Sequence, residues 1–195
     1  MGSLVVMLGQ HDTAGRSTEH KTQIKTVKRM IVHRDYNPET FDNDIALLEL
    51  DVPFEMQPNV IPICLPEADK DLVGLYGHVS GFGKLSYGGM MPNILQTVKL
   101  PIIANDKCQK MFADAGHYKF IGNNFVCAGY PQGGKDSCEG DSGGPLMMEH
   151  DGIWTLIGTV SHGIKCAEPN MPGVYMKTYS YLNWIKSVIE QNGQK

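Results

Sequence analysis

Short apolar runs, each closed by a turn residue, make up most of the hydrophobic pattern of this chain. Apolar side chains alternate with polar ones or stand together over short stretches, and Gly, Pro or Asn follows. This pattern is typical of the strands of a β-sandwich or barrel, so an all-β fold is expected. The predicted strands are Gln23–His33, Ile45–Leu50, Gly77–Gly83, Leu95–Ile103, Phe125–Gly129, Pro145–Glu149, Thr155–Ser161 and Gly173–Thr178.

Two segments depart from the strand pattern and predict helices. Asn105 is a residue type that caps helices, and it predicts a short helix through Met111. From Tyr181 onward, apolar residues recur at helical spacing until the chain reaches Gly193. These residues are Leu182, Ile185, Val188 and Ile189. The second helix is expected to pack on the outside of a barrel.

Composition fits one globular unit. The chain has 195 residues, of which 42% are hydrophobic, enough to bury a sizeable core. Its net charge of −4 argues against nucleic acids and anionic membranes as partners. No apolar run approaches the length of a transmembrane span. The run Leu4–Leu8 is too short, and too poor in preceding basic residues, to be a secretory leader.

Residues 140–145 read Gly-Asp-Ser-Gly-Gly-Pro, and Cys138 lies just upstream. A serine hydroxyl is a weak nucleophile, so it needs an adjacent base and donors that hold the oxyanion. A glycine-rich turn with no catalytic role is the alternative, which a lone Gly-x-Ser-x-Gly would leave open. The full run resembles the nucleophile loop of the chymotrypsin/trypsin family of serine proteases. The resemblance makes Ser142 the nucleophile, and the N–H groups of Gly140 and Ser142 the oxyanion hole.

Two further segments resemble the same family in the expected order. Residues 42–48, Asp-Asn-Asp-Ile-Ala-Leu-Leu, resemble the segment of the triad aspartate, and the resemblance gives that role to Asp44. Taken alone, Asp44 would be interpreted as a turn residue before a buried strand. Residues 160–163, Val-Ser-His-Gly, resemble the segment that binds the substrate backbone, with Ser161 supporting the aspartate.

The resemblance runs from about residue 4 to about residue 190. It implies a chymotrypsin-like double antiparallel β-barrel with a C-terminal helix, in a single domain over residues 1–195. Residues 1–67 would be the later strands of an incomplete first barrel, 68–179 the second barrel and 180–191 the helix. The open strand edges of an incomplete barrel invite aggregation or pairing with another chain.

The resemblance also implies a specificity pocket. Asp136 lies six residues before Ser142, where trypsin-like members place the acid at the pocket floor. Gly163 and Gly173 stand at the wall positions and would leave room for a long side chain. A buried carboxylate facing this slot selects Arg or Lys, so protein substrates with those residues at the cleavage site are expected. The alternative is a solvated loop aspartate. His162 stands on the substrate-binding side, where the family usually has tryptophan.

No histidine has the sequence context of the family's general base. The chain has seven: His11, His20, His33, His78, His117, His150 and His162. His162 is expected near Ser142, but on the substrate side, and is not expected to replace the base. The Ile-Val-Gly-Gly segment, whose amino group pairs with the aspartate before the serine, is likewise not found. Asp141 is therefore expected to have no partner, and the chain by itself to be nearly inactive.

The resemblance pairs Cys108 with Cys127 and Cys138 with Cys166. Disulfides imply an oxidising compartment, so the protein is expected to be secreted. Cys64 is left over. In family members with a regulatory chain this position bridges to that chain, and an odd cysteine suggests an intermolecular partner. A buried free thiol is the alternative.

We expect no cofactor and no metal ion. The family has a calcium loop in some members, corresponding here to residues 9–20, but Gln10 stands where a carboxylate ligand is usual.

Three interpretations follow from the sequence. The chain is a trypsin-like serine endopeptidase domain whose N-terminal part lies outside this sequence; or it is a native short form that acts as a secreted binding or regulatory module; or it is a non-functional product of a truncated gene.

Overall fold

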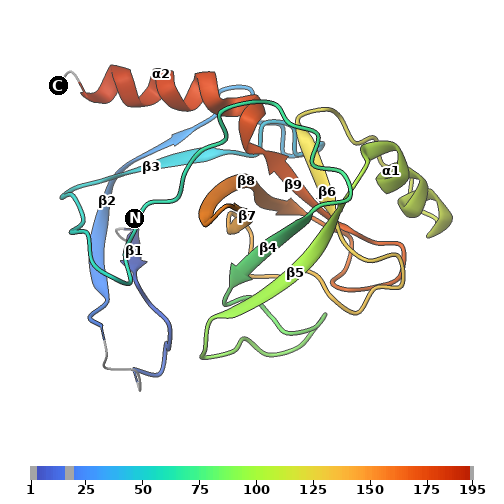
Figure 1. Ribbon diagram of the computed structural model, residues 1–195, viewed down its shortest axis with the longest axis horizontal. Helices are drawn as coiled ribbons and strands as arrows, with labels where there is room; N and C mark the ends of the chain where they lie inside the picture. Colours follow the sequence, from blue (N-terminus) through green and yellow to red (C-terminus); the bar gives the residue numbers. More distant parts are fainter. Residues whose placement is uncertain (1–3, 16–19, 194–195) are drawn as a thin grey trace.

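The computed structural model describes residues 4–15 and 20–193. Strands dominate, as the sequence predicts (Figure 1). They are β1 (Val5–Leu8), β2 (Gln23–Val32), β3 (Ala46–Leu50), β4 (Tyr76–Gly81), β5 (Gln96–Ile103), β6 (Phe125–Ala128), β7 (Pro145–His150), β8 (Ile153–His162) and β9 (Gly173–Lys177). The predicted strand segments are confirmed, with ends that differ by one or two residues.

The strands form a closed barrel and a separate sheet. The barrel has the order β4-β5-β6-β9-β8-β7, and each neighbouring pair is antiparallel. The separate sheet has three strands in the order β1-β2-β3 and stands beside the barrel in Figure 1. This arrangement is consistent with a chymotrypsin-like double barrel in which only the second barrel is closed.

Two hydrophobic clusters hold this arrangement. One fills the barrel, where Leu100, Leu146 and Tyr175 have no exposed surface. The other lies between the barrel and the helices, around Phe112, and Ile45 just before β3 and Leu47 within β3 pack against it. The β1–β3 sheet is thereby attached to the barrel through its last strand. Burying a side chain of this size contributes about 1.5–3 kcal/mol.

The described part of the chain also contains two α-helices and one short 3₁₀ turn: α1 (Asn105–Asp114), η1 (Thr178–Tyr181) and α2 (Leu182–Gly193). The prediction that Asn105 caps α1 is wrong. Ala104 is the cap and makes no side-chain hydrogen bond, whereas Asn105 is already helical. The Asn105 amide instead donates to the carbonyls of Gly122 and Phe125, at 2.9 and 3.1 Å, and so ties α1 to the chain that enters β6.

Candidate active site

A cavity of about 300 Å³ brings together most residues that the sequence analysis singled out. The turn before β7 contributes Ser142, the end of β8 contributes Ser161 and His162, and β9 begins with Gly173. The remaining predicted lining residues are Asp136 and Gly163, with Cys138 and Cys166 of one disulfide. Segments that are far apart in the sequence therefore form one site, because the barrel places β7, β8 and β9 side by side.

Asp136 is one of several ionisable residues of this cavity, which Glu139, His162 and Lys165 also line. Its carboxylate accepts hydrogen bonds from the N–H groups of Ser137, at 2.8 Å, and Ala167, at 3.1 Å. The pKa of Asp136 is nevertheless raised to about 7: burial is the largest cause, the negative charge of Asp141 adds to it, and the two backbone hydrogen bonds oppose it. Gly173 is required beside it, because a Cβ at that position would lie 2.9 Å from the Asp136 carboxylate. No cation is paired with Asp136 among the described residues.

The loop that carries Ser142 is held by Asp141. The Asp141 carboxylate accepts hydrogen bonds from the N–H groups of Gly83, at 2.8 Å, and Cys138, at 2.9 Å. The expectation that Asp141 has no partner is therefore wrong: backbone donors from two loops surround it. Gly81 and Gly83 leave the space that this carboxylate occupies, since a Cβ at either would collide with it.

The two N–H groups predicted to hold the oxyanion have no hydrogen-bond acceptor within the described structure. Neither the N–H of Gly140 nor that of Ser142 donates a hydrogen bond to a described residue. Gly140 has a φ of 98°, a conformation that favours glycine, and a Cβ there would crowd Gly83 and Met91. Ser142 itself is exposed.

Asp44 is connected to the cavity by a hydrogen bond with the lining residue Ser161. Ser161, which is buried, donates from its hydroxyl to the Asp44 carboxylate at 2.7 Å. All seven histidines fall within the described residues, and none is hydrogen-bonded there to Asp44 or Ser142. His33, for example, packs against Tyr181 and Trp184 instead.

His162 is enclosed by aromatic rings. Its imidazole stacks on Phe41, with ring centroids 4.7 Å apart and an interplanar angle of 19°. Phe125 meets it edge-on at 5.6 Å. The pKa of His162 is lowered to about 4: burial is the largest cause, the positive charge of Lys119 adds to it, and the negative charge of Asp42 opposes both. His162 is therefore neutral at physiological pH. The sequence analysis missed Phe41 as a lining residue, although it lies only three positions before Asp44.

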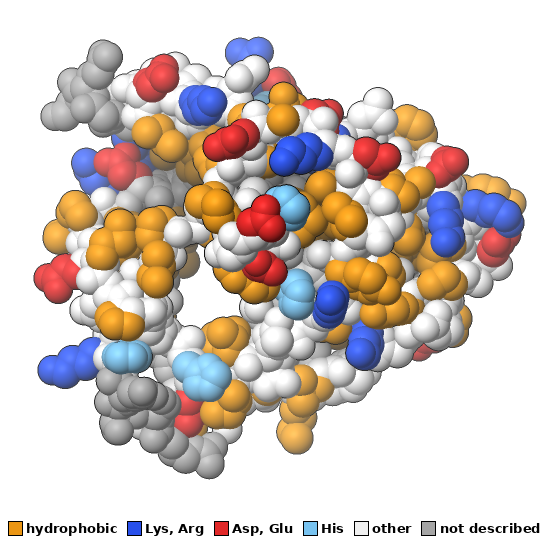
Figure 2. All heavy atoms as spheres, viewed as in Figure 1, with side chains coloured by type: hydrophobic (Ala, Val, Ile, Leu, Met, Phe, Trp, Pro, Cys, Tyr) orange, Lys and Arg blue, Asp and Glu red, His pale blue; other side chains and the backbone are white. Residues whose placement is uncertain are grey.

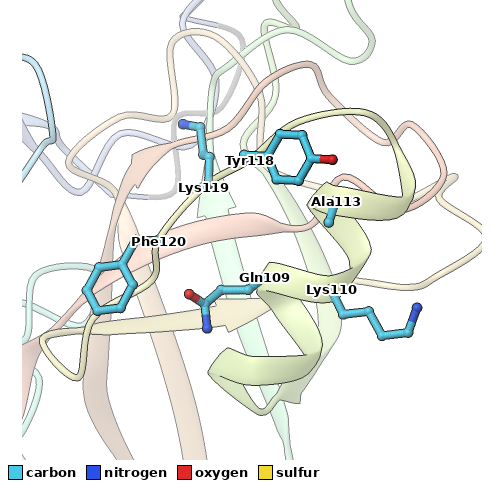
Figure 3. A pocket seen from close by; sticks show the side chains of 6 residues that line it. All are labelled: Gln109, Lys110, Ala113, Tyr118, Lys119 and Phe120. Carbon is cyan, nitrogen blue, oxygen red and sulfur yellow. The ribbon is translucent and has the colours of Figure 1, made fainter.

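A second hollow, of about 460 Å³, opens on the outer side of α1 (Figure 3). It is lined by Gln109, Lys110, Ala113, Tyr118, Lys119 and Phe120. The Lys119 and Lys110 side chains point away from each other in Figure 3, and Lys110 is paired with Asp114 at 2.8 Å. Lys119 is the residue of this hollow whose charge acts on His162. Nothing in the sequence pattern had distinguished it.

Both expected disulfides are present. Cys108 of α1 is bonded to Cys127 of β6, and Cys138 is bonded to Cys166 beside the cavity. Cys64 is a free and exposed thiol, so the alternative of a buried one is wrong. Backbone hydrogen bonds with Trp154 and Leu156, at 3.2 and 2.9 Å, hold Cys64 against β8.

The described residues contain no cluster of three or more His, Cys, Asp or Glu side chains able to hold a metal ion. The proposed absence of calcium at residues 9–20 stays a prediction, since residues 16–19 lie outside the described part of the chain. No helix in the described ranges has the length and hydrophobicity needed to cross a membrane.

Three features of the site are typical of a serine protease. Ser142 lies in a tight glycine-rich loop, Asp44 accepts a hydrogen bond from Ser161, and the cavity beside Ser142 contains the Asp136 carboxylate. Comparison with known proteins agrees: residues 1–185 match the family model described as Trypsin. This chain belongs to the trypsin family of serine proteases.

Relatives of the chain carry names of the same class. It is 52% identical over 189 residues to serine protease filzig and 44% identical over 181 residues to serine proteinase stubble, both of Drosophila melanogaster. It is 36% identical over 194 residues to the clotting factor G beta subunit of Tachypleus tridentatus. These matches cover 96%, 92% and 95% of this chain but 11%, 23% and 61% of the relatives. The chain therefore spans only part of each relative.

Proposed function

We propose that this trypsin-like serine protease domain binds and cleaves proteins after Arg or Lys. The observation that carries the specificity is the cavity that joins Asp136 to Ser142. Its Asp136 carboxylate has two backbone donors and is paired with no cation among the described residues, so a long cationic side chain would supply the counter-charge. Gly163 and Gly173 also line the cavity and place no side chain in it.

The roles of the other residues follow from the same geometry. Ser142 would form the acyl-enzyme, and the N–H groups of Gly140 and Ser142 would hold the oxyanion. Asp44, fixed by Ser161, would orient the general base and stabilise its charged form. Asp141 would keep the nucleophile loop in place, and in an activated protease would pair with the new amino terminus.

The general base is the missing component. Since no histidine is hydrogen-bonded to Ser142 or Asp44 in the described structure, we expect this polypeptide by itself to hydrolyse peptides negligibly. A segment outside this sequence would then have to supply the histidine. Robust turnover of an Arg ester by mass-verified protein of this sequence would overturn that expectation.

The same observation favours a second candidate. A domain with an intact cavity and no base would serve as a binding or regulatory module that retains Arg- or Lys-containing segments without cutting them. The two candidates differ in one respect only: the protein isolated from its natural source either contains a histidine-bearing segment, seen by intact mass and N-terminal sequencing, or it does not.

Benzamidinium binding tests the cavity, because this small cation fits a carboxylate-floored slot and requires no catalysis. We expect the wild-type chain to bind p-aminobenzamidine with a rise in ligand fluorescence. Asp136→Asn should weaken binding about 100-fold or more, since it removes the counter-charge from an enclosed site. Asp151→Asn is the matched control: it makes the same chemical change at a side chain that is 86% exposed and does not line the cavity, so binding should change less than about threefold. Equal binding by the wild type and Asp136→Asn would contradict the proposal.

We further propose that the protein is secreted and that Cys64 forms a disulfide with a regulatory chain. The thiol is exposed and its backbone is fixed on β8, so a partner cysteine could reach it without disturbing the barrel. Non-reducing and reducing electrophoresis of the natural protein tests this. A second chain that separates on reduction, and is absent from a Cys64→Ser variant, would support it; a free thiol in the natural protein would not.

A further inference from the structure

Ser161 lies between two polar groups, and its single hydroxyl proton cannot serve both. The hydroxyl donates to Asp44 Oδ2 at 2.7 Å. The same oxygen is 3.1 Å from Nδ1 of His162. An ionised carboxylate only accepts hydrogen bonds, and a hydroxyl has one proton and two lone pairs. With that proton committed to Asp44, the contact with His162 is a hydrogen bond only if Nδ1 carries a proton and donates it.

The surroundings of His162 allow only one proton on its ring. Phe41 stacks on one face and Phe125 meets it edge-on, so its environment is largely apolar and disfavours the imidazolium. The depressed pKa of His162, to about 4, agrees. A neutral imidazole has one N–H and one acceptor nitrogen. If the N–H is at Nδ1, Nε2 is left as an acceptor in the cavity wall.

We propose that His162 is a positioning residue, which as the Nδ1–H tautomer donates to Ser161 Oγ and so commits the Ser161 hydroxyl to Asp44. The hydrogen bonds then run in one direction, from the substrate-side ring to the acid. The proposal rests on the proposed function only for the catalytic meaning of Asp44, because the hydrogen-bond chain itself exists without catalysis.

The opposite tautomer would have the opposite effect. With its proton on Nε2, Nδ1 would be an acceptor and would compete with Asp44 for the single Ser161 proton. Hydrogen bonds in a chain also polarise one another, so the Nδ1–H donor strengthens the bond that Asp44 receives. A tryptophan at position 162 could not do this, since both ring atoms attached to its Cγ are carbons. The histidine therefore adds a connection between the substrate-binding wall and Asp44.

Nitrogen NMR of the imidazole rings tests the tautomer directly, since protonated and unprotonated ring nitrogens have well-separated shifts. At about pH 7 we expect His162 to show a protonated Nδ1 and an unprotonated Nε2. His33 is an internal reference with the opposite pattern. Its Nδ1 accepts from the backbone N–H of Asp35 at 3.3 Å, so the neutral ring carries its proton on Nε2. A wild-type His162 with its proton on Nε2 would overturn the proposal.

Substitutions then test the direction of the hydrogen bonds from His162 through Ser161 to Asp44. In Asp44→Ala, the Ser161 hydroxyl loses its acceptor and should turn to His162, which should change to the Nε2–H tautomer. Ser161→Ala should also end the predominance of the Nδ1–H form of His162. This variant provides the test if Asp44→Ala does not fold. His33 signals should stay unchanged in both variants. A His162 tautomer unaffected by Ser161→Ala would show that Ser161 does not select it.

A conservative rescue separates positioning from packing. The side-chain amide nitrogen of Asn can occupy the place of Nδ1, whereas Phe keeps the ring and loses the donor. We expect the Ser161 hydroxyl proton to exchange slowly in the wild type and in His162→Asn, and to be lost to fast exchange in His162→Phe. Slow exchange in His162→Phe would contradict the proposal. Binding of p-aminobenzamidine is measured on the same samples. If the wild type shows the Nδ1–H tautomer of His162 but does not bind p-aminobenzamidine, the proposed function is refuted and this inference is retained.

Discussion

Asp136 shows how one residue can be unfavourable for the folded chain and useful for binding. The pKa of its carboxyl group is raised to about 7 by burial, whereas an unfolded chain has a value near 3.8. The folded protein therefore holds this proton to a higher pH, and the contribution of Asp136 to stability falls as the pH rises from about 4 to about 7. A bound cation reverses this cost, because it pairs with the ionised form.

This predicts a pH dependence for ligand binding. Below about pH 7, benzamidinium must displace the Asp136 proton, so its affinity should fall roughly tenfold per pH unit well below that value. Above about pH 7 the affinity should level off. Calorimetry in buffers of different ionisation enthalpy should detect about one proton released per ligand near pH 5.5. An affinity that stays flat from about pH 5 to 8 would show that Asp136 is ionised throughout.

Lys119 and His162 provide a second residue-scale prediction. The charge of Lys119 is one of the causes of the low pKa of His162, so Lys119→Gln should raise that pKa by a few tenths of a unit. Lys110→Gln is the control, since Lys110 is on the far side of the hollow and is paired with Asp114. The titration of the His162 ring signals measures both. Equal shifts in the two variants would mean that the effect is one of net charge rather than of position.

At the scale of elements, the two disulfides differ in their position relative to the cavity: Cys138 and Cys166 line it, whereas Cys108 and Cys127 do not. Cys108–Cys127 joins α1 to β6 and closes a loop of 19 residues, whereas Cys138–Cys166 closes one of 28 residues beside the cavity. Chain entropy gives each about 3–4 kcal/mol.

We therefore expect replacement of either pair by Ala to lower the free energy of unfolding by about 3 kcal/mol. Only the Cys138/Cys166 variant should also weaken benzamidinium binding, because both of those cysteines line the cavity. Denaturant unfolding and ligand titration at a temperature where both variants are folded separate the two effects. Equal losses of binding in the two variants would contradict this assignment.

On the scale of the whole molecule, the barrel and the β1–β3 sheet differ in how they bury their side chains. The barrel is closed and its interior is inaccessible, whereas apolar side chains of the sheet face solvent, as the left of Figure 2 shows. Exposed apolar cross-strand pairs include Met7 with Ile24, and Met30 with Leu48. Open strands with apolar side chains bind hydrophobic dyes and pair with other chains.

We expect this polypeptide to bind a hydrophobic dye in its folded state and to self-associate at high concentration. Ile24→Lys and Met30→Lys should lower both signals, because each removes an exposed apolar group that is 63% and 60% accessible, respectively. Thr26→Lys adds the same charge to the same strand without removing an apolar side chain, so dye binding should persist. Dye fluorescence and sedimentation measure the outcome. Absence of dye binding in the wild type would mean that the sheet is covered in solution.

The sequence by itself determined the elements and the family. Strand segments follow from local alternation and turn residues, and the Gly-Asp-Ser-Gly-Gly-Pro run is specific because few backbones accept a serine in such a turn. The pairing of Cys108 with Cys127 and of Cys138 with Cys166 followed from the resemblance those motifs carry. All of these features depend on short stretches of chain.

Only the tertiary structure decided what surrounds each polar group. The Gly83 donor on Asp141, the carbonyl partners of Asn105 and the aromatic enclosure of His162 all involve residues distant in sequence or on another element, and the exposure of Cys64 depends on the whole fold. A proton's position on Ser161 or His162 depends on distances of about 3 Å between such groups. Hydrogen bonding and desolvation act over these short distances in space, and the order of residues along a chain does not specify them.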